Sequence, residues 1–241
     1  MISRELTRAC ARASGRHVSF TPLRHPGAIG SGVHVHLSLW NRLNEPVSFD
    51  PAGIAGMSQQ LSRFAAGIVA HMPALCALTA PSVVSYERLQ PHRWSSAYTC
   101  MGDRNREATL RICPLQDGDD ATRRRQFNIE YRAADATANP YLVLAGLIHA
   151  GIDGLEQELG APPLVNADPS ELPAETLQRL GVRRLPQSLP EALDALAGDA
   201  GVHAWLPKGL HEALLLEKQA ELLACEGLDA QGVCARYAAV F

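Results

Sequence analysis

The 241-residue sequence lacks several features that define common classes of protein. Its six cysteines include no CxxC pair, which argues against a zinc site built from cysteines and indicates reduced thiols, most of them in the core. Its formal net charge is only -3, so no overall basic field exists to hold nucleic acid. The N-terminus has no apolar signal core, and the chain shows no internal repeat or coiled-coil heptad. We therefore expect a cytoplasmic protein that binds neither nucleic acid nor membrane.

The composition is that of a folded chain, because 46% of the residues are hydrophobic. This is enough for one large domain, or for a domain with an appendage. The motifs described below lie within residues 1–159. A stretch rich in Pro, Gly and Asp over 160–187 predicts an ordered segment that crosses the surface, or a linker, and residues 188–241 are expected to form C-terminal helices.

Hydrophobic periodicity and turn residues predict the individual elements. Helices are expected over 3–14, over 52–71 before Pro73, in a short segment reaching Pro81, and over 208–226 and 229–239. Strand-like runs cover 17–20, 33–39, 94–113 and 127–132, and 117–125 reads as a charged loop. Asn139 and Pro140 are start signals for a helix to about residue 159. Ser188 and Glu191 form a capping box for a helix over 189–197.

Four short segments carry the residues typical of a site that handles phosphate. The first alternates strictly from Val33 to Leu39, so that His34, His36 and Ser38 share one strand face. Glu130 and Arg132 share a face in the same way. The other two segments supply guanidinium groups for phosphate or carboxylate, at Arg104–Arg106 and at Arg111. Together they suggest metal–nucleotide chemistry on a negatively charged substrate.

In their order and spacing, these segments resemble the C-terminal catalytic domain of the glutamine synthetase family. The matching stretches are 30–39, 85–89, 104–106 with Arg111, 129–132 and 135–141, and the similarity runs from near residue 5 to about residue 197. The resemblance implies an α+β fold, with a curved, mostly antiparallel sheet and helices packed on its outside. It also implies a reaction in which ATP phosphorylates the γ-carboxylate of a glutamate-like substrate and an amine displaces the phosphate.

The resemblance further implies a role for each matching residue. His34 and Glu130 would ligate Mg²⁺ or Mn²⁺ between the ATP phosphates. His36, Ser38, Arg111 and Arg125 would contact ATP, and Gly30, Arg88 and Arg132 would bind the carboxylate substrate. Arg106 would touch both substrate and γ-phosphate, and would offset charge during transfer.

Two departures from the family pattern modify these expectations. The chain corresponds to part of the family's catalytic domain, without the N-terminal β-grasp domain and the half that supplies most metal-binding glutamates. We therefore expect the 241-residue chain alone to be inactive and the complete protein to form a homo-oligomer. Trp94 stands where the family has a glutamate that deprotonates ammonium, and Ile29 replaces an asparagine. An indole cannot act as a base, so the amine is expected to be larger than ammonia, with Trp94 packing on it.

Other interpretations of these residues stay open. His34 and His36 are compatible with surface histidines, Glu130 and Arg132 with an ion pair, and 123–125 with a solvated charge run. Trp94 is equally compatible with a packing role. At the level of the whole protein, the alternatives are a non-catalytic assembly or nucleotide-binding module, and a phosphotransferase acting on guanidino compounds.

Overall fold

The computed structural model describes residues 2–93 and 96–241, and its centre is an open sheet of four short strands. The strands are β1 (Val35–Leu37), β2 (Met101–Asp103), β3 (Leu110–Ile112) and β4 (Ile129–Tyr131), in the spatial order β1-β4-β3-β2. β4 pairs antiparallel with both β1 and β3, whereas β2 and β3 are parallel. The expected α+β class with a mostly antiparallel sheet is confirmed, with one parallel pair added.

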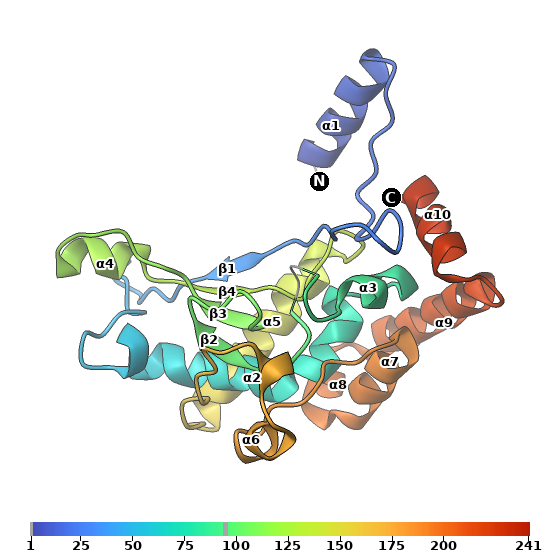
Figure 1. The fold of residues 1–241 in the computed structure, drawn as a ribbon. Helices are drawn as coiled ribbons and strands as arrows, with labels where there is room; N and C mark the ends of the chain where they lie inside the picture. Colours follow the sequence, from blue (N-terminus) through green and yellow to red (C-terminus); the bar gives the residue numbers. More distant parts are fainter. Residues whose placement is uncertain (1, 94–95) are drawn as a thin grey trace.

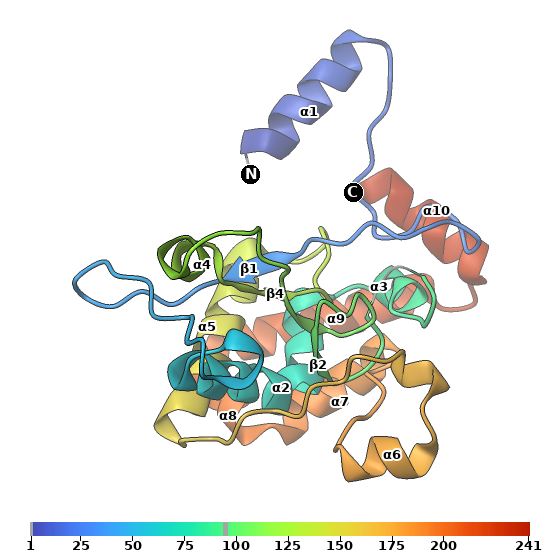
Figure 2. The ribbon, with the colours of Figure 1, turned by 60° about the vertical axis from the view of Figure 1, so that its left-hand side comes forward.

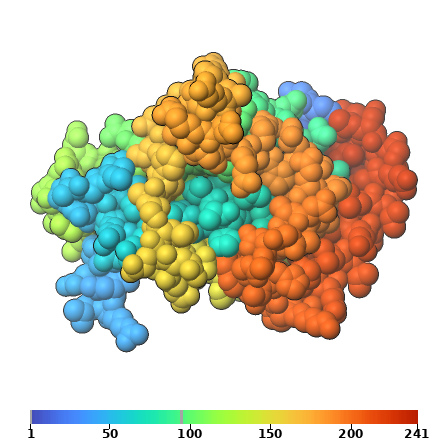
Figure 3. Space-filling model, turned by 90° about the horizontal axis from the view of Figure 1, so that it is seen from below, coloured from blue at the N-terminus to red at the C-terminus, as the bar shows by residue number. Residues whose placement is uncertain are grey.

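Helices cover one face of this sheet (Figures 1 and 2). The helices are α1 (Ile2–Ala13), α2 (Gln59–Thr79), α3 (Val83–Arg88), α4 (Asp120–Gln126), α5 (Pro140–Glu156), α6 (Ala174–Arg179), α7 (Leu189–Gly198), α8 (Ala200–Trp205), α9 (Lys208–Cys225) and α10 (Ala230–Val240), with 3-10 turns at Ile54–Gly56 and Pro169–Glu171. Seen from below, the chain from α5 to α9 forms the middle of the surface, with α2 visible between these segments and the C-terminal end of the chain, in red, at one side (Figure 3). The opposite face of the sheet is the one that carries Glu130 and the other predicted site residues of the strands.

The core forms where α2 packs against α5, α7 and the inner face of the sheet. Leu110, Ile129 and Tyr131 point into this core. Glu130 lies between two of them, so strand alternation directs it to the other face. The helices α2 and α5 approach closely, because a Cβ atom on Gly154 would lie only 2.6 Å from the backbone nitrogen of Gly67. The core thus fixes the strands that carry the site.

Local capping signals set several helix boundaries as expected. Asn139 Oδ1 accepts a hydrogen bond from Tyr141 N at 2.9 Å, with Pro140 at the first helical position. Ser188 Oγ accepts one from Glu191 N at 3.3 Å and begins α7. α9 and α10 also lie where they were predicted.

Several predictions about the elements were wrong. α2 begins at Gln59, where the Ser58 hydroxyl accepts a hydrogen bond from Leu61 N, and it continues through Pro73 to Thr79. Proline removes one helical hydrogen bond, but burial of the residues on both sides outweighs that loss. The presumed loop 117–125 contains α4, capped by Asp119. Residues 17–20 pair with no strand, and Ala200–Trp205 forms a helix that was not predicted.

α2 is also long and apolar enough to cross a membrane by length and composition alone. However, 72% of its most apolar window is buried within the fold. This burial matches a core helix, since its apolar side chains already contact α5, α7 and the sheet.

The N-terminal helix α1 stands away from the rest of the molecule (Figures 1 and 2). None of its residues is buried. Arg4 links it to the body by donating a hydrogen bond to the carbonyl of Ala136, and both Arg4 and Arg8 lie over the Phe20 ring. Its apolar residues Ile2 and Leu6 remain exposed.

Candidate functional site

The site is organised around Glu130, at the centre of β4. In the strand register Glu130 is opposite His36 of β1 on one side and Arg111 of β3 on the other. Its carboxylate is 2% exposed and contacts three cationic or potentially cationic groups. Arg111 Nε lies 2.9 Å from Oε1, Arg132 Nη1 donates a hydrogen bond to the same oxygen, and His36 Nε2 lies 3.3 Å from Oε2.

The arginines decide the ionisation of this carboxylate. Burial alone would raise the pKa of Glu130, but the hydrogen bond and charge of Arg132, together with the charge of Arg111, outweigh burial and lower it. Glu130 is therefore ionised at neutral pH. Burial, followed by the charge of Arg132, lowers the pKa of His34, which keeps this imidazole neutral. An ionised carboxylate and a neutral imidazole are the forms that bind metal ions.

A cavity of about 350 Å³ opens beside these groups. It is lined by four residues predicted for the site and by one that was not: His34, Arg106, Arg111, Arg132 and Glu107. Three guanidinium groups in one cavity favour a polyanion such as a phosphate chain or a dicarboxylate. Glu107 supplies a carboxylate at its edge, and burial, followed by the charge of Asp168, raises the pKa of that group.

His34 and Glu130 lie close enough to reach a common cation. His34 Nδ1 is 3.9 Å from Glu130 Oε1 and 3.5 Å from Arg132 Nη1. One imidazole nitrogen and carboxylate oxygens fit a divalent ion such as Mg²⁺ or Mn²⁺, which prefers oxygen-rich coordination. The donor set therefore fits the implied metal, although these two side chains supply only part of a coordination shell.

His36 and Ser38 follow on the same face but are more exposed. His36 has half of its side chain in solvent, and its Nδ1 lies 2.8 Å from Asn128 Oδ1. Ser38 Oγ accepts a hydrogen bond from Trp40 Nε1 at 3.2 Å. Their predicted contacts with ATP stay predictions, as do the assigned roles of the other site residues.

The remaining predicted residues that the structure describes lie outside the cavity lining. Arg88 is 1% exposed and donates hydrogen bonds to the carbonyls of Ala133 and Ala134. Gly30 packs on the Arg88 stem, so closely that a Cβ atom would collide with it. Arg125 is exposed on α4, and Trp94 falls outside the described residues.

Sequence reasoning missed Cys113, Asn128 and Glu107. Cys113 follows β3 and has its Sγ 3.7 Å from Glu130 Oε2. Burial and then the charge of Glu130 raise the pKa of the Cys113 thiol to about 11, so it donates to the carboxylate. No sequence spacing links Cys113 to His36, because only strand pairing brings them together.

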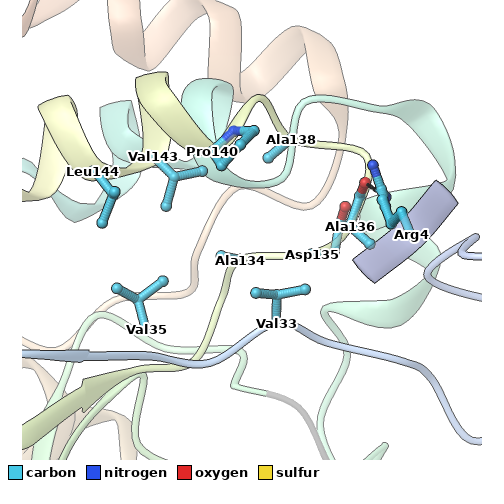
Figure 4. A pocket seen from close by; sticks show the side chains of 10 residues that line it. All are labelled: Arg4, Val33, Val35, Ala134, Asp135, Ala136, Ala138, Pro140, Val143 and Leu144. Atoms are coloured by element: carbon cyan, nitrogen blue, oxygen red, sulfur yellow. Dashed lines mark hydrogen bonds between the residues drawn. The ribbon is translucent and has the colours of Figure 1, made fainter. Parts of the chain in front are cut away.

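The opposite face of β1 borders a second, apolar cavity of about 290 Å³ (Figure 4). Val35 of β1 and Val33, two residues before it, point into this cavity, and Val143 and Leu144 face them from α5 (Figure 4). The predicted alternation along 33–39 thus separates an apolar cavity from a charged one.

Comparisons with known proteins give a consistent result. A family model described as "Glutamine synthetase, catalytic domain" matches residues 1–230. A curated "Gamma-glutamylpolyamine synthetase GlnA3" of Streptomyces coelicolor is 38% identical over 98% of this chain and 50% of that protein. A "Glutamine synthetase" of Methanocaldococcus jannaschii is 34% identical over 88% of this chain and 45% of that protein.

Solved structures agree with this result. A structure titled "Crystal structure of novel glutamine synthase homolog" is 42% identical with a TM-score of 0.85, over 99% of this chain and 52% of that one. Another, titled "GmaS/ADP complex-Conformation 1", is 27% identical with a TM-score of 0.78, over 94% of this chain and 50% of that one. The chain therefore spans about half the length of the relatives it matches.

Proposed function

Because the chain belongs to the glutamine synthetase family of ligases, we propose that the complete protein joins an amine to the γ-carboxylate of a glutamate-like substrate. ATP would first form a γ-glutamyl phosphate, which the amine then attacks. The observation that carries this proposal is the cavity lined by His34, Arg106, Arg111 and Arg132, two of which, Arg111 and Arg132, pair with the ionised Glu130. Such a cavity compensates the charge of a polyphosphate and a carboxylate held together.

In this proposal, each side chain of the site has a separate role that follows from its position. Arg106 is exposed at the cavity, where it would contact the transferred phosphoryl group, and Arg111 would contact the ATP phosphates. Arg132, held by Glu130, would bind a substrate carboxylate. His34 and Glu130 would hold Mg²⁺ or Mn²⁺, which when bound offsets phosphate charge.

Glu107 is the residue that we assign to the amine. Among the described residues, it supplies a carboxylate to a cavity that His34 and three arginines also line. An amine substrate arrives as a cation and must lose a proton before it attacks. A carboxylate with a raised pKa is a better proton acceptor, so Glu107 would attract the ammonium group and take its proton.

We also propose an amine larger than ammonia, such as an alkylamine or polyamine. The similarity to a γ-glutamylpolyamine synthetase supports this choice. Trp94, at the predicted position of the ammonium-binding glutamate, supports it from the sequence. Phosphate release by the full-length protein with ATP and glutamate, measured across ammonium, ethylamine and putrescine, tests it. Faster release with the larger amines is expected, and strict preference for ammonium would refute the substrate assignment.

The complete protein would act as a homo-oligomer. The exposed face of α5 carries Tyr141, Leu144, Ile148 and Ile152 at helical spacing, and such a stripe is typical of a surface covered by further polypeptide. The six free cysteines support a reducing compartment such as the cytoplasm. Light scattering of the full-length protein tests the assembly.

A further inference from the structure

A second set of metal-binding groups lies at Oε2 of Glu130, the oxygen opposite the one that Arg132 contacts. His36, Cys113 and Glu130 each place one ligand atom within 4.8 Å of the others. They come from β1, from the residue after β3, and from β4. Cys113 and Glu130 are buried, while His36 is exposed and opens the group to solvent.

The two oxygens of Glu130 are divided between different neighbours. Oε1 faces Arg111 and Arg132. Oε2 faces His36 Nε2 at 3.3 Å and Cys113 Sγ at 3.7 Å. This division leaves Oε2 directed at one nitrogen and one sulfur ligand. The charge of the neighbouring Arg111 favours the thiolate form of Cys113.

Asn128 orients the imidazole of His36 for this purpose. The Asn128 amide donates to the carbonyl of Gln126 at 2.8 Å, which turns its Oδ1 toward His36 Nδ1. With Nδ1 facing Asn128 Oδ1, Nε2 is the ring nitrogen directed at Glu130 Oε2, and a metal ion bound there would take the place of a proton on Nε2. Metal-binding histidines are commonly held by a second hydrogen bond of this kind.

The spacing of the ligand atoms matches a small tetrahedral ion. Zinc bonds of about 2.0–2.3 Å at tetrahedral angles place neighbouring ligand atoms roughly 3.3–3.6 Å apart. The two distances to Glu130 Oε2, 3.3 Å and 3.7 Å, are close to this spacing, and the third pair, His36 Nε2 and Cys113 Sγ, lies within 4.8 Å. A thiolate with an imidazole and a carboxylate favours Zn²⁺ over Mg²⁺.

We propose that His36 Nε2, Cys113 Sγ and Glu130 Oε2 form a binding site for a soft divalent ion of the Zn²⁺ class. The thiol of Cys113 releases its proton to solvent when the metal–sulfur bond forms. A water molecule or an exchangeable ligand occupies the fourth position, on the side that His36 opens to solvent. This site stands on its own geometry, whether or not the proposed ligase reaction occurs.

The site has a consequence for the cavity beside it. Glu130 belongs both to this set and to the predicted Mg²⁺ or Mn²⁺ pair with His34. A soft ion on Oε2 would therefore compete with a hard ion that needs the same carboxylate.

Cobalt titration tests the site without any turnover, because Co²⁺ bound to thiolate absorbs in the near ultraviolet. The metal-free 241-residue protein is titrated with Co²⁺ and then with Zn²⁺. We expect a sulfur-to-cobalt charge-transfer band that Zn²⁺ abolishes and Mg²⁺ leaves unchanged. Absence of the band at saturating Co²⁺ would overturn the proposal.

Four variants test the assignment of the ligands. Cys113→Ser should abolish the band, while Asn128→Ala should keep it and weaken Co²⁺ binding about 10–100-fold. Cys10→Ser removes the exposed cysteine on α1 and should change neither. Circular dichroism checks that each variant folds. His36→Ala removes the imidazole ligand at an exposed position and so tests a second ligand of the site. A band lost in Cys10→Ser but kept in Cys113→Ser would refute the assignment.

Discussion

His71 connects three helices beneath the sheet, and its charge should make the stability of the fold depend on pH. The imidazole extends from α2, with Nδ1 2.7 Å from Asp199 Oδ2 and Nε2 3.1 Å from Asp153 Oδ2. Asp153 lies on α5, and Asp199 caps α8. Burial alone would lower the pKa of His71, but the hydrogen bonds to Asp199 and Asp153 outweigh it and raise the pKa.

The raised pKa sets the direction of the effect. The stabilisation is fully present below the unfolded histidine pKa of about 6.5, and it is lost as pH rises through the higher folded value. Charge-assisted hydrogen bonds contribute about 1.5–3 kcal/mol each in buried sites. The side chains of His71, Asp153 and Asp199 are 15%, 29% and 19% exposed, and solvent weakens such bonds. We therefore expect the two hydrogen bonds of His71 together to add about 2–3 kcal/mol to the free energy of unfolding.

Urea unfolding of wild type and His71→Gln measures this effect. At about pH 6 the variant should be less stable by about 2–3 kcal/mol, and at about pH 9 the difference should shrink because wild-type His71 has lost its charge. His149→Gln is the matched control, since His149 stacks on the same Trp205 ring that His71 meets edge-on. A stability difference for His71→Gln that is constant between the two pH values would refute the reasoning.

Three further predictions concern the site and the core. Glu130→Gln should destabilise the fold by about 3 kcal/mol in urea unfolding at neutral pH, because it leaves the Arg132 charge buried without its partner. Since the pKa of Glu130 is lowered in the folded protein, this loss of stability should diminish as the pH falls through that lowered pKa. A loss that stays constant with pH would contradict the prediction. In the full-length protein, Glu107→Gln should lower kcat/KM for a cationic amine about 100-fold and leave the KM for ATP unchanged, as measured by steady-state phosphate release. A variant that keeps the wild-type kcat/KM would show that Glu107 does not belong to the amine site. Gly67→Ala should lower stability by about 1–3 kcal/mol because its Cβ would meet the α5 backbone at Gly154, whereas Gly198→Ala, with open space around it, is the control in thermal unfolding.

Local signals in the sequence were sufficient for several elements. The alternation from Val33 to Leu39 predicted both faces of β1, because successive strand side chains point in opposite directions. Asn139 and Ser188 marked two helix starts, because a capping side chain bonds to backbone only two or three residues away. The motif order also pointed to the family, which the comparisons confirm.

Longer-range contacts decided the rest. The continuation of α2 through Pro73 depends on packing against α5 and α7, which outweighs a local helix-stopping signal. The burial of Arg88 beneath Gly30 likewise depends on contacts between segments far apart in the chain.

The sequence by itself determined the residue types of the site, the faces of β1 and the family, since these depend on neighbouring residues and on motif order. Only the tertiary structure decided which side chains meet at Glu130. Strand register places His36 and Arg111 on either side of it and brings Cys113 to its second oxygen. The physical reason is that pairing between strands is set by the packing of the whole core, and no spacing along the chain encodes it.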